Sequence, residues 1–247
     1  MMKGYTMRRK LLVANWKLYV SSPAEAQRLA QDSNVAGVVL CPPFPFLSLV
    51  AGAAPRAALG AQDVFWEQEG AYTGEVSGVM LRRIGVRYVV VGHSERRALF
   101  AEDDRVVRKK LAAALAAKLA PILCVGEPKK VWRRGMLASW KFVRAQLARA
   151  LRGLPLARKG LLVAYEPIWA IGGKGSDDPS RSAEMAKRIM RTFPQVTRVL
   201  YGGSITSRNV RAFLAREEIG GALVGGASAR SAEWRRILAQ VGKVGGS

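Results

Sequence analysis

Residues 161–179 read LLVAYEPIWAIGGKGSDDP, and they contain the pattern that decides the fold. A continuous apolar run from Leu161 to Tyr165 ends in one carboxylate, Glu166, and three glycines interrupted by a lysine follow a few residues later. Unbroken apolar runs, in contrast to alternating ones, are typical of strands that are covered on both faces, as in a parallel sheet. This stretch therefore predicts a buried parallel strand that places a glutamate at its carboxyl end.

Similar apolar runs recur at intervals along the chain, and a helix-like segment follows each of them. The eight runs are Lys10-LLVAN, Gly37-VVLC, Ala57-ALGAQ, Arg87-YVVVG, Pro121-ILCVG, Gly160-LLVAYE, Arg198-VLYGG and Gly221-ALVGG. Between them, Ser22-PAEAQRLAQ places Ser and Pro where a helix cap and first turn favour them, and Glu102 to Leu119 is rich in Ala, Leu and Lys. Eight such units without a linker predict a single domain over residues 1–247, a (β/α)8 barrel of eight parallel strands surrounded by helices.

The composition, 49% hydrophobic with 23% charged residues, is that of an ordinary globular protein, and no apolar run approaches the roughly 18 residues of a membrane span. The basic start MMKGYTMRRK imitates a signal peptide, but the apolar stretch after it is too short. We therefore expect a cytoplasmic protein without a membrane partner. Cys41 and Cys124 lie in apolar runs as small hydrophobes, and with His93 as the only histidine they make no metal-ligand spacing, so no metal is expected.

The net charge of +22 is unusual for a chain of this size. Forty Lys and Arg residues against eighteen acids predict non-specific attraction of polyanions and faster encounter with anionic substrates. A basic barrel that binds nucleic acid is therefore one alternative. The charged stretch from Lys129 to Arg134 contains one Trp, but the chain has no visible nucleic-acid-binding motif.

In barrels of this kind the chemistry lies at the carboxyl ends of the strands. The polar and glycine residues at these ends are Asn15, Lys17, His93, Ser94, Glu95, Glu127, Glu166, Gly202, Gly203, Ser204, Gly225 and Gly226. Glu166 in partly dry surroundings would suit a general base, although a salt bridge to a loop would also explain it. His93 precedes a helix start, where a neutral imidazole is favoured, and a packed histidine is the alternative.

Two further features at these ends indicate an anionic ligand. Lys17 would project over the barrel mouth, unless it is only one solvated cation among forty. The glycine pairs 202–203 and 225–226 leave backbone N–H groups uncovered at two adjacent strand ends, where this fold often binds phosphate. Either pair alone could be a tight turn, but together they favour a phosphate site.

Taken together, these residues resemble the triosephosphate isomerase family over nearly the whole chain. The matching motifs are Asn15-Trp-Lys17, Gly60-Ala-Gln-Asp63, Tyr72-Thr-Gly-Glu75, Gly92-His-Ser-Glu-Arg-Arg97, Cys124-Val-Gly-Glu127, Ala164-Tyr-Glu-Pro-Ile-Trp-Ala-Ile-Gly172, Tyr201-Gly-Gly-Ser204 and Gly221-Ala-Leu-Val-Gly-Gly-Ala-Ser228. The resemblance implies an isomerase of glycolysis and gluconeogenesis that needs no cofactor. Its substrates would be dihydroxyacetone phosphate and glyceraldehyde 3-phosphate.

The resemblance also assigns catalytic roles. Glu166 is expected to move a proton between two substrate carbons, and His93 to polarise the carbonyl as a neutral imidazole. Lys17 and Asn15 are expected to stabilise the enediolate oxygen and the dianion. Glu95 would hold the neighbouring network, including the lysine. The residues implied to bind the phosphate are Asn15, Lys17, Gly172, Ser204, Gly225 and Gly226.

The resemblance further implies moving and subunit parts. The segment of Pro167, Ile168 and Trp169 would be the stiff hinge of a lid formed by the glycines after it, with Glu127 as the partner of Trp169. The loop within residues 64–77 that carries Thr73 and Gly74 would enter a neighbouring subunit near Lys17. A homodimer is therefore expected.

This chain departs from the family in three places. The family's lid usually continues as Gly-Thr-Gly-Lys-Thr, whereas Gly172 is followed here by Gly-Lys-Gly-Ser, and Asp63 stands where the family commonly has Asn. After Glu127 the family's acidic patch is replaced by PKKVWRR, residues 128–134. A different sugar-phosphate isomerase or lyase with the same phosphate cradle, and a barrel that has lost its activity, remain as alternatives.

Overall fold

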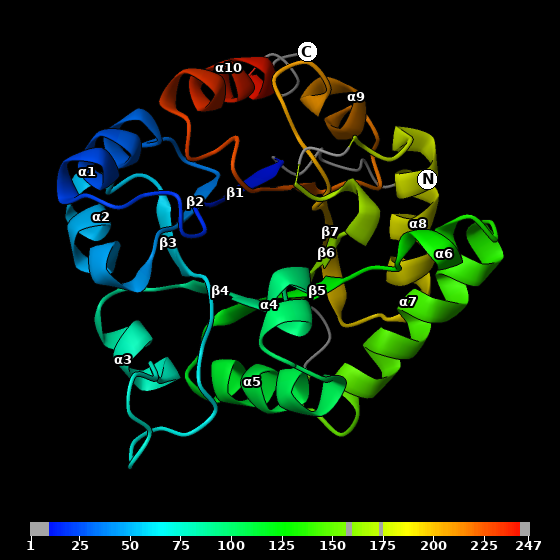
Figure 1. The fold of residues 1–247 in the computed structure, drawn as a ribbon, viewed down its shortest axis with the longest axis horizontal. Coiled ribbons are helices and arrows are strands. Elements are labelled where there is room, and N and C mark those ends of the chain that lie inside the picture. The colour runs from blue at the N-terminus through cyan, green and yellow to red at the C-terminus, as the bar shows by residue number, and fades with distance from the viewer. Residues whose placement is uncertain (1–9, 157–159, 173–174, 243–247) are drawn as a thin grey trace, which may run out of the picture.

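A computed structural model describes residues 10–156, 160–172 and 175–242 of the chain. Eight parallel strands pair in chain order, and β1 also pairs with β8, which closes the sheet into a barrel (Figure 1). The strands are β1 (Leu11–Asn15), β2 (Val38–Cys41), β3 (Ala58–Ala61), β4 (Tyr88–Val91), β5 (Ala120–Val125), β6 (Leu161–Tyr165), β7 (Val196–Tyr201) and β8 (Gly221–Val224). All eight predicted runs are strands, so the (β/α)8 prediction is confirmed.

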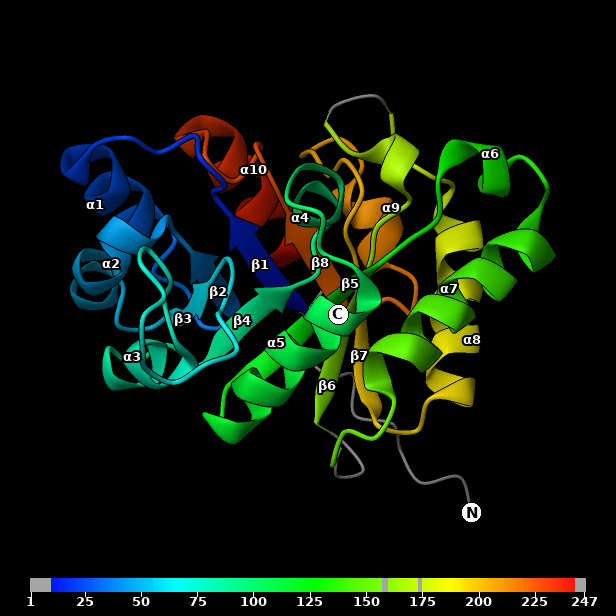
Figure 2. The ribbon, with the colours of Figure 1, turned by 60° about the horizontal axis from the view of Figure 1, so that its bottom comes forward.

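Helices surround this barrel as a ring, which Figure 1 shows face-on. Their bounds are α1 (Pro23–Asp32), α2 (Leu47–Ala53), α3 (Gly78–Arg83), α4 (Ser94–Leu99), α5 (Asp104–Ala116), α6 (Lys129–Trp132), α7 (Met136–Leu151), α8 (Pro179–Thr192), α9 (Val210–Leu214) and α10 (Ser231–Gly242), with short 3-10 turns η1 (Phe44–Phe46) and η2 (Ile168–Ala170). Figure 2 shows α4 and α6 at the same end of the barrel. Within the described residues, no helix has the length and apolar character that crossing a membrane requires.

The predicted helix signals have local physical causes. The Ser22 side chain accepts a hydrogen bond from the Glu25 backbone N–H, and Pro23 occupies the first turn of α1. The helix expected from Glu102 to Leu119 is shorter than predicted. It begins at Asp104 because Asp103 caps the Val106 N–H, and it ends before Lys118, whose φ of 58° is left-handed.

Two apolar layers explain why the strands read as unbroken apolar runs. Side chains of successive strand residues point to opposite faces, so one set fills the barrel and the other packs under the helices. The inner cluster is Val13, Val39, Cys41, Val90, Ile122, Cys124, Ala164, Leu200 and Leu223. Both cysteines are free and buried. Burial raises the pKa of the Cys41 thiol to about 12 and that of Cys124 well above its usual range, so both stay protonated as small apolar groups.

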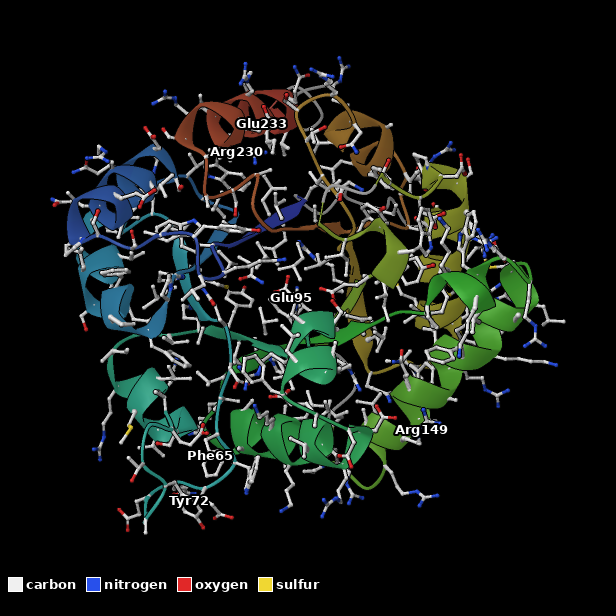
Figure 3. All side chains as sticks on the ribbon, viewed as in Figure 1. Phe65, Tyr72, Glu95, Arg149, Arg230 and Glu233 are labelled. Atoms are coloured by element: carbon white, nitrogen blue, oxygen red, sulfur yellow. The ribbon has the colours of Figure 1, made fainter. Side chains whose placement is uncertain are left out.

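The predicted loop after β3 extends away from the barrel, as Figures 1 and 2 both show. Its ends are joined by a single bridge between Phe65 and Ser77. The Phe65 ring lies 4.1 Å from that of Trp66 and 4.8 Å from that of Tyr72, which gives the loop a small aromatic centre of its own. Figure 3 labels Phe65 and Tyr72 in this loop, far from the barrel mouth.

Candidate active site

The carboxyl ends of β1, β4 and β6 bring together Lys17, His93 and Glu166, which are far apart in the sequence. Glu95 is the second residue of α4, and it lies near the centre of the helix ring in Figure 3. The structure thus places a carboxylate, an imidazole and a cation at one mouth. Among the described residues, no group of three or more His, Cys, Asp or Glu side chains could hold a metal ion.

Glu166 is almost completely buried, with 1% of its surface exposed. Its Oε2 accepts a hydrogen bond from the backbone N–H of Ser94 at 3.3 Å. Its Oε1 lies 3.6 Å from His93 Nε2 and has no hydrogen-bond partner among the described residues. One carboxylate oxygen is therefore held by the backbone at the start of α4, and the other is a buried acceptor without a partner among the described residues.

His93 is the N-cap residue of α4, as its position before a helix start predicted. Its Nδ1 accepts a hydrogen bond from the Glu95 backbone N–H at 3.2 Å. A ring nitrogen that accepts carries no proton, so this contact favours the tautomer with its hydrogen on Nε2. The Nε2–H can then donate to an oxygen in the barrel mouth.

Lys17 has a φ of 51°, which is strained for a residue other than glycine. Its backbone N–H donates to Asn15 Oδ1 at 3.1 Å, and its carbonyl accepts from Gln62 Nε2 at 2.9 Å. Its Nζ pairs with Glu95 Oε1 at 2.5 Å. The sequence does not reveal this role of Gln62, because a single amide after a strand carries no signal by itself.

The predicted phosphate residues gather at the ends of β7 and β8. A Cβ atom at Gly225 would lie 3.0 Å from Lys17 Cε, and one at Gly226 would lie 3.1 Å from the Tyr19 ring. The glycines therefore admit these side chains from the β1 loop. Ser204 donates both its N–H and its hydroxyl to the Ala170 carbonyl, at 2.8 and 2.6 Å, so the ends of β6 and β7 are joined here. Gly172 has a φ of 78°, which favours glycine.

Two glycines pack directly on Glu166, a contact that the sequence did not predict for either of them. A Cβ atom at Gly202 would lie 2.6 Å from Glu166 Cγ, and one at Gly126 would lie 1.8 Å from the Glu166 carbonyl oxygen. The neighbouring strands β5 and β7 thus leave just enough room for this residue. Only the closed barrel reveals the contact, because Gly126 and Gly202 are distant from Glu166 in sequence.

The hinge prediction falls on an ordered turn, but one expected contact is absent. The Ile168 N–H donates to the Glu127 carbonyl at 3.1 Å, where η2 begins. The buried Glu127 carboxylate accepts from the Tyr165 hydroxyl at 2.9 Å, and burial raises its pKa. Trp169 Nε1 has no hydrogen-bond partner among the described residues. Glu127 is therefore paired with Tyr165 and not with Trp169 in this structure, and lid residues 173 and 174 lie outside the described part.

Asp63 belongs to a buried ion network beside the site. Its carboxylate lies 2.6 Å from Lys110 Nζ and 2.9 Å from an Arg96 nitrogen. Glu102 contacts the same two cations, Lys110 at 2.5 Å and Arg96 at 2.6 Å. Because Arg96 lies on α4, the network fixes the helix that carries His93 and Glu95 at its start. Lys110 lies between the buried Val107 and Leu111, and only 3% of its surface is exposed. A lysine at such a position in the sequence is the signal that could have indicated this buried network.

Thr73 and Gly74 are exposed in the loop after β3, which extends away from the barrel (Figure 1). Side chains that flank Lys17 and Glu95 are also exposed although they are apolar. The exposed fractions are 91% for Leu18, 62% for Tyr19, 74% for Leu99 and 62% for Phe100.

A (β/α)8 barrel with a carboxylate, an imidazole and a lysine at its carboxyl-end mouth is typical of enzymes that act on small anionic substrates. Residues 10–241 match the family model described as triosephosphate isomerase, and the chain belongs to this family. It is 42% identical to the triosephosphate isomerase of Synechococcus sp., over 94% of this chain and 97% of that protein. It is 40% identical to that of Caldanaerobacter subterraneus, with 94% and 99% covered, and 40% identical to that of Moorella thermoacetica, with 94% and 98% covered.

Proposed function

We propose that this chain interconverts dihydroxyacetone phosphate and D-glyceraldehyde 3-phosphate, and so acts in glycolysis and gluconeogenesis. The relatives named triosephosphate isomerase support this activity. The observation that carries it is Glu166 Oε1, which has no hydrogen-bond partner in the described part of the chain and lies 3.6 Å from His93 Nε2 in the mouth that also holds Lys17.

The proton transfer needs one base and two groups that stabilise negative charge. Glu166 removes a proton from the carbon beside the substrate carbonyl, and the carbonyl oxygen takes up the electron pair as an enediolate. His93 donates its Nε2–H to this oxygen, and the Lys17 ammonium lowers the energy of the developing charge. Glu166 then returns the proton to the neighbouring carbon, and the proton of the substrate hydroxyl moves to the former carbonyl oxygen, so that the carbonyl and hydroxyl groups exchange places. Because substrate and product are isomers, no oxidant or reductant takes part.

Backbone N–H groups hold the phosphate in this proposal. Gly172, Gly225 and Gly226 donate to it, and Ser204 joins them by exchanging the Ala170 carbonyl, to which its N–H and hydroxyl donate in this structure, for a phosphate oxygen. Asn15 supports the backbone of Lys17 through their 3.1 Å hydrogen bond. Glu95 keeps the Lys17 side chain in place through the 2.5 Å ion pair.

The segment from Pro167 to Trp169 acts as the hinge of a lid that excludes water while the intermediate exists. Exclusion of water protects the enediolate from loss of its phosphate group. Residues 173 and 174 of this lid lie outside the described part, so the proposal rests on the ordered turn η2.

We further propose that the chain works as a single catalytic domain in a cytoplasmic homodimer. The Thr73–Gly74 tip would enter the partner subunit near Lys17. A partner there would cover Leu18 and Tyr19, whose exposed fractions of 91% and 62% are costly for apolar side chains.

A coupled assay tests the activity directly. Glyceraldehyde 3-phosphate is supplied, and the dihydroxyacetone phosphate formed is reduced by an auxiliary NADH-dependent dehydrogenase. We expect turnover by the wild-type chain and none by the Glu166→Gln variant. No turnover by the purified wild-type chain, or turnover only on longer sugar phosphates, would refute the proposal.

A further inference from the structure

Trp132 lies in the segment where this chain departs from its family, at the end of α6. Its ring is half-buried and lies 4.5 Å from the ring of Trp169, at an interplanar angle of 50°. Its Nε1 donates to Asp177 Oδ1 at 3.2 Å. One side chain thus contacts both the segment that follows Glu166 and the segment that leads into α8.

The Asp177 side of this contact is firmly anchored in the core. Asp177 is 3% exposed, and its backbone N–H donates to the Tyr201 hydroxyl at 2.9 Å. Its Oδ2 accepts from the Ser182 hydroxyl at 3.2 Å. The Tyr201 ring stacks on Phe213 at 3.9 Å and 11°, so the anchor reaches from β7 to α9.

Arg181 fixes Trp132 from a second direction. Its guanidinium carbon lies 5.1 Å from the centre of the Trp132 ring, and it donates to the Trp132 carbonyl at 3.4 Å. The same guanidinium donates to the Ser139 hydroxyl at 2.9 Å. Trp132 is therefore tied to both α7 and α8 through groups that are themselves held.

Trp169 has no comparable polar anchor. Its Nε1 lacks a hydrogen-bond partner among the described residues, and its ring contact is with Trp132. Trp169 is three residues after Glu166, and Pro167 between them has a restricted φ, so a displacement at Trp169 is passed toward the carboxylate.

We propose that Trp132 is a positioning residue for the reaction, which joins Trp169 to the Asp177–Tyr201 anchor and so fixes the segment that carries Glu166. This inference rests on the proposed isomerase function. The position of Trp132 explains why an aromatic residue with an N–H group is useful there: the ring holds Trp169 and the N–H holds Asp177.

Kinetics of Trp132 variants test the inference. Trp132→Leu is expected to lower kcat about tenfold and to change KM about twofold or less, because a misplacement of 1 Å at a catalytic group costs about 100-fold and only part of that displacement is expected. Trp132→Phe keeps the ring contact with Trp169 but loses the N–H that holds Asp177, so it is expected to recover only part of kcat. The matched control is Trp140→Leu on α7, which is also partly buried against the core but lies outside these contacts.

The outcomes separate this inference from the proposed function. A wild-type chain that does not isomerise triose phosphates overturns the function. A wild-type chain that isomerises, together with a Trp132→Leu variant of unchanged kcat, overturns only the role of Trp132. Urea unfolding of each variant measures its unfolding free energy and so detects a purely structural effect. If kcat falls equally in Trp140→Leu and Trp132→Leu, in proportion to the loss of unfolding free energy, the proposed role of Trp132 is also overturned.

Discussion

Replacement of Gly202 by alanine would show how closely the barrel holds the Glu166 carboxylate. The added Cβ would lie 2.6 Å from Glu166 Cγ and 3.3 Å from Oε1. Carbon atoms in ordinary contact are about 3.5–4.0 Å apart, so the Glu166 side chain must move by roughly 1 Å. Gly202 is not among the residues with a positive φ, so alanine brings no backbone strain of its own.

The expected result is a large loss of activity with a small loss of stability. A displacement of about 1 Å at the reacting group lowers the rate about 100-fold, and we expect this change in kcat. The unfolding free energy should fall by only about 0.5–1.5 kcal/mol, because the cost is a Glu side chain pushed from its rotamer. The coupled assay in both directions measures the first quantity, and urea unfolding measures the second.

Gly52→Ala is the matched control, because a Cβ atom at this position in α2 would meet nothing within 4 Å. It should keep the wild-type kcat and gain up to about 1 kcal/mol, since alanine favours a helix over glycine. A Gly202→Ala enzyme with wild-type kcat would refute the reasoning, because the base would then tolerate a displacement or lie elsewhere.

Four further outcomes are expected. Glu166→Asp withdraws the carboxylate by about one methylene and should lower kcat about 100-fold in steady-state kinetics. Glu166→Gln should lower kcat more, because an amide cannot take the proton. If either variant turns over at the wild-type rate, the base is a different residue. Thr73→Arg should give poorly active monomers, and sedimentation of an intact, active oligomer would contradict the proposed subunit contact. Lys110→Met leaves Asp63 and Glu102 buried with Arg96 as their remaining cation and should lower the unfolding free energy by about 3–5 kcal/mol, measured by urea unfolding. Raising the ionic strength should lower kcat/KM, because a chain of net charge +22 attracts a dianionic substrate; flat kinetics would mean that the charge serves another partner, which RNA filter binding would then probe.

Much of the site could be predicted from the ends of the strands. Glu166, His93 and Lys17 each follow an apolar run, and a parallel barrel gathers such positions at one mouth. The expected contact between Glu127 and Trp169 is absent from this structure, in which Tyr165, on the adjacent strand β6, supplies the donor to one Glu127 oxygen.

The sequence by itself determined the eight strands, their order and the residues at their ends. A strand of a parallel sheet is buried on both faces, so its residues form a local, unbroken apolar run that can be recognised in the sequence. Only the tertiary structure decided what those ends touch. The close approach of Gly202 to Glu166, the Asp63 network and the Trp132 contacts join side chains from different strand-and-helix units. Such contacts depend on the tilt and stagger of neighbouring strands in the closed barrel, and no local pattern of residues predicts these quantities.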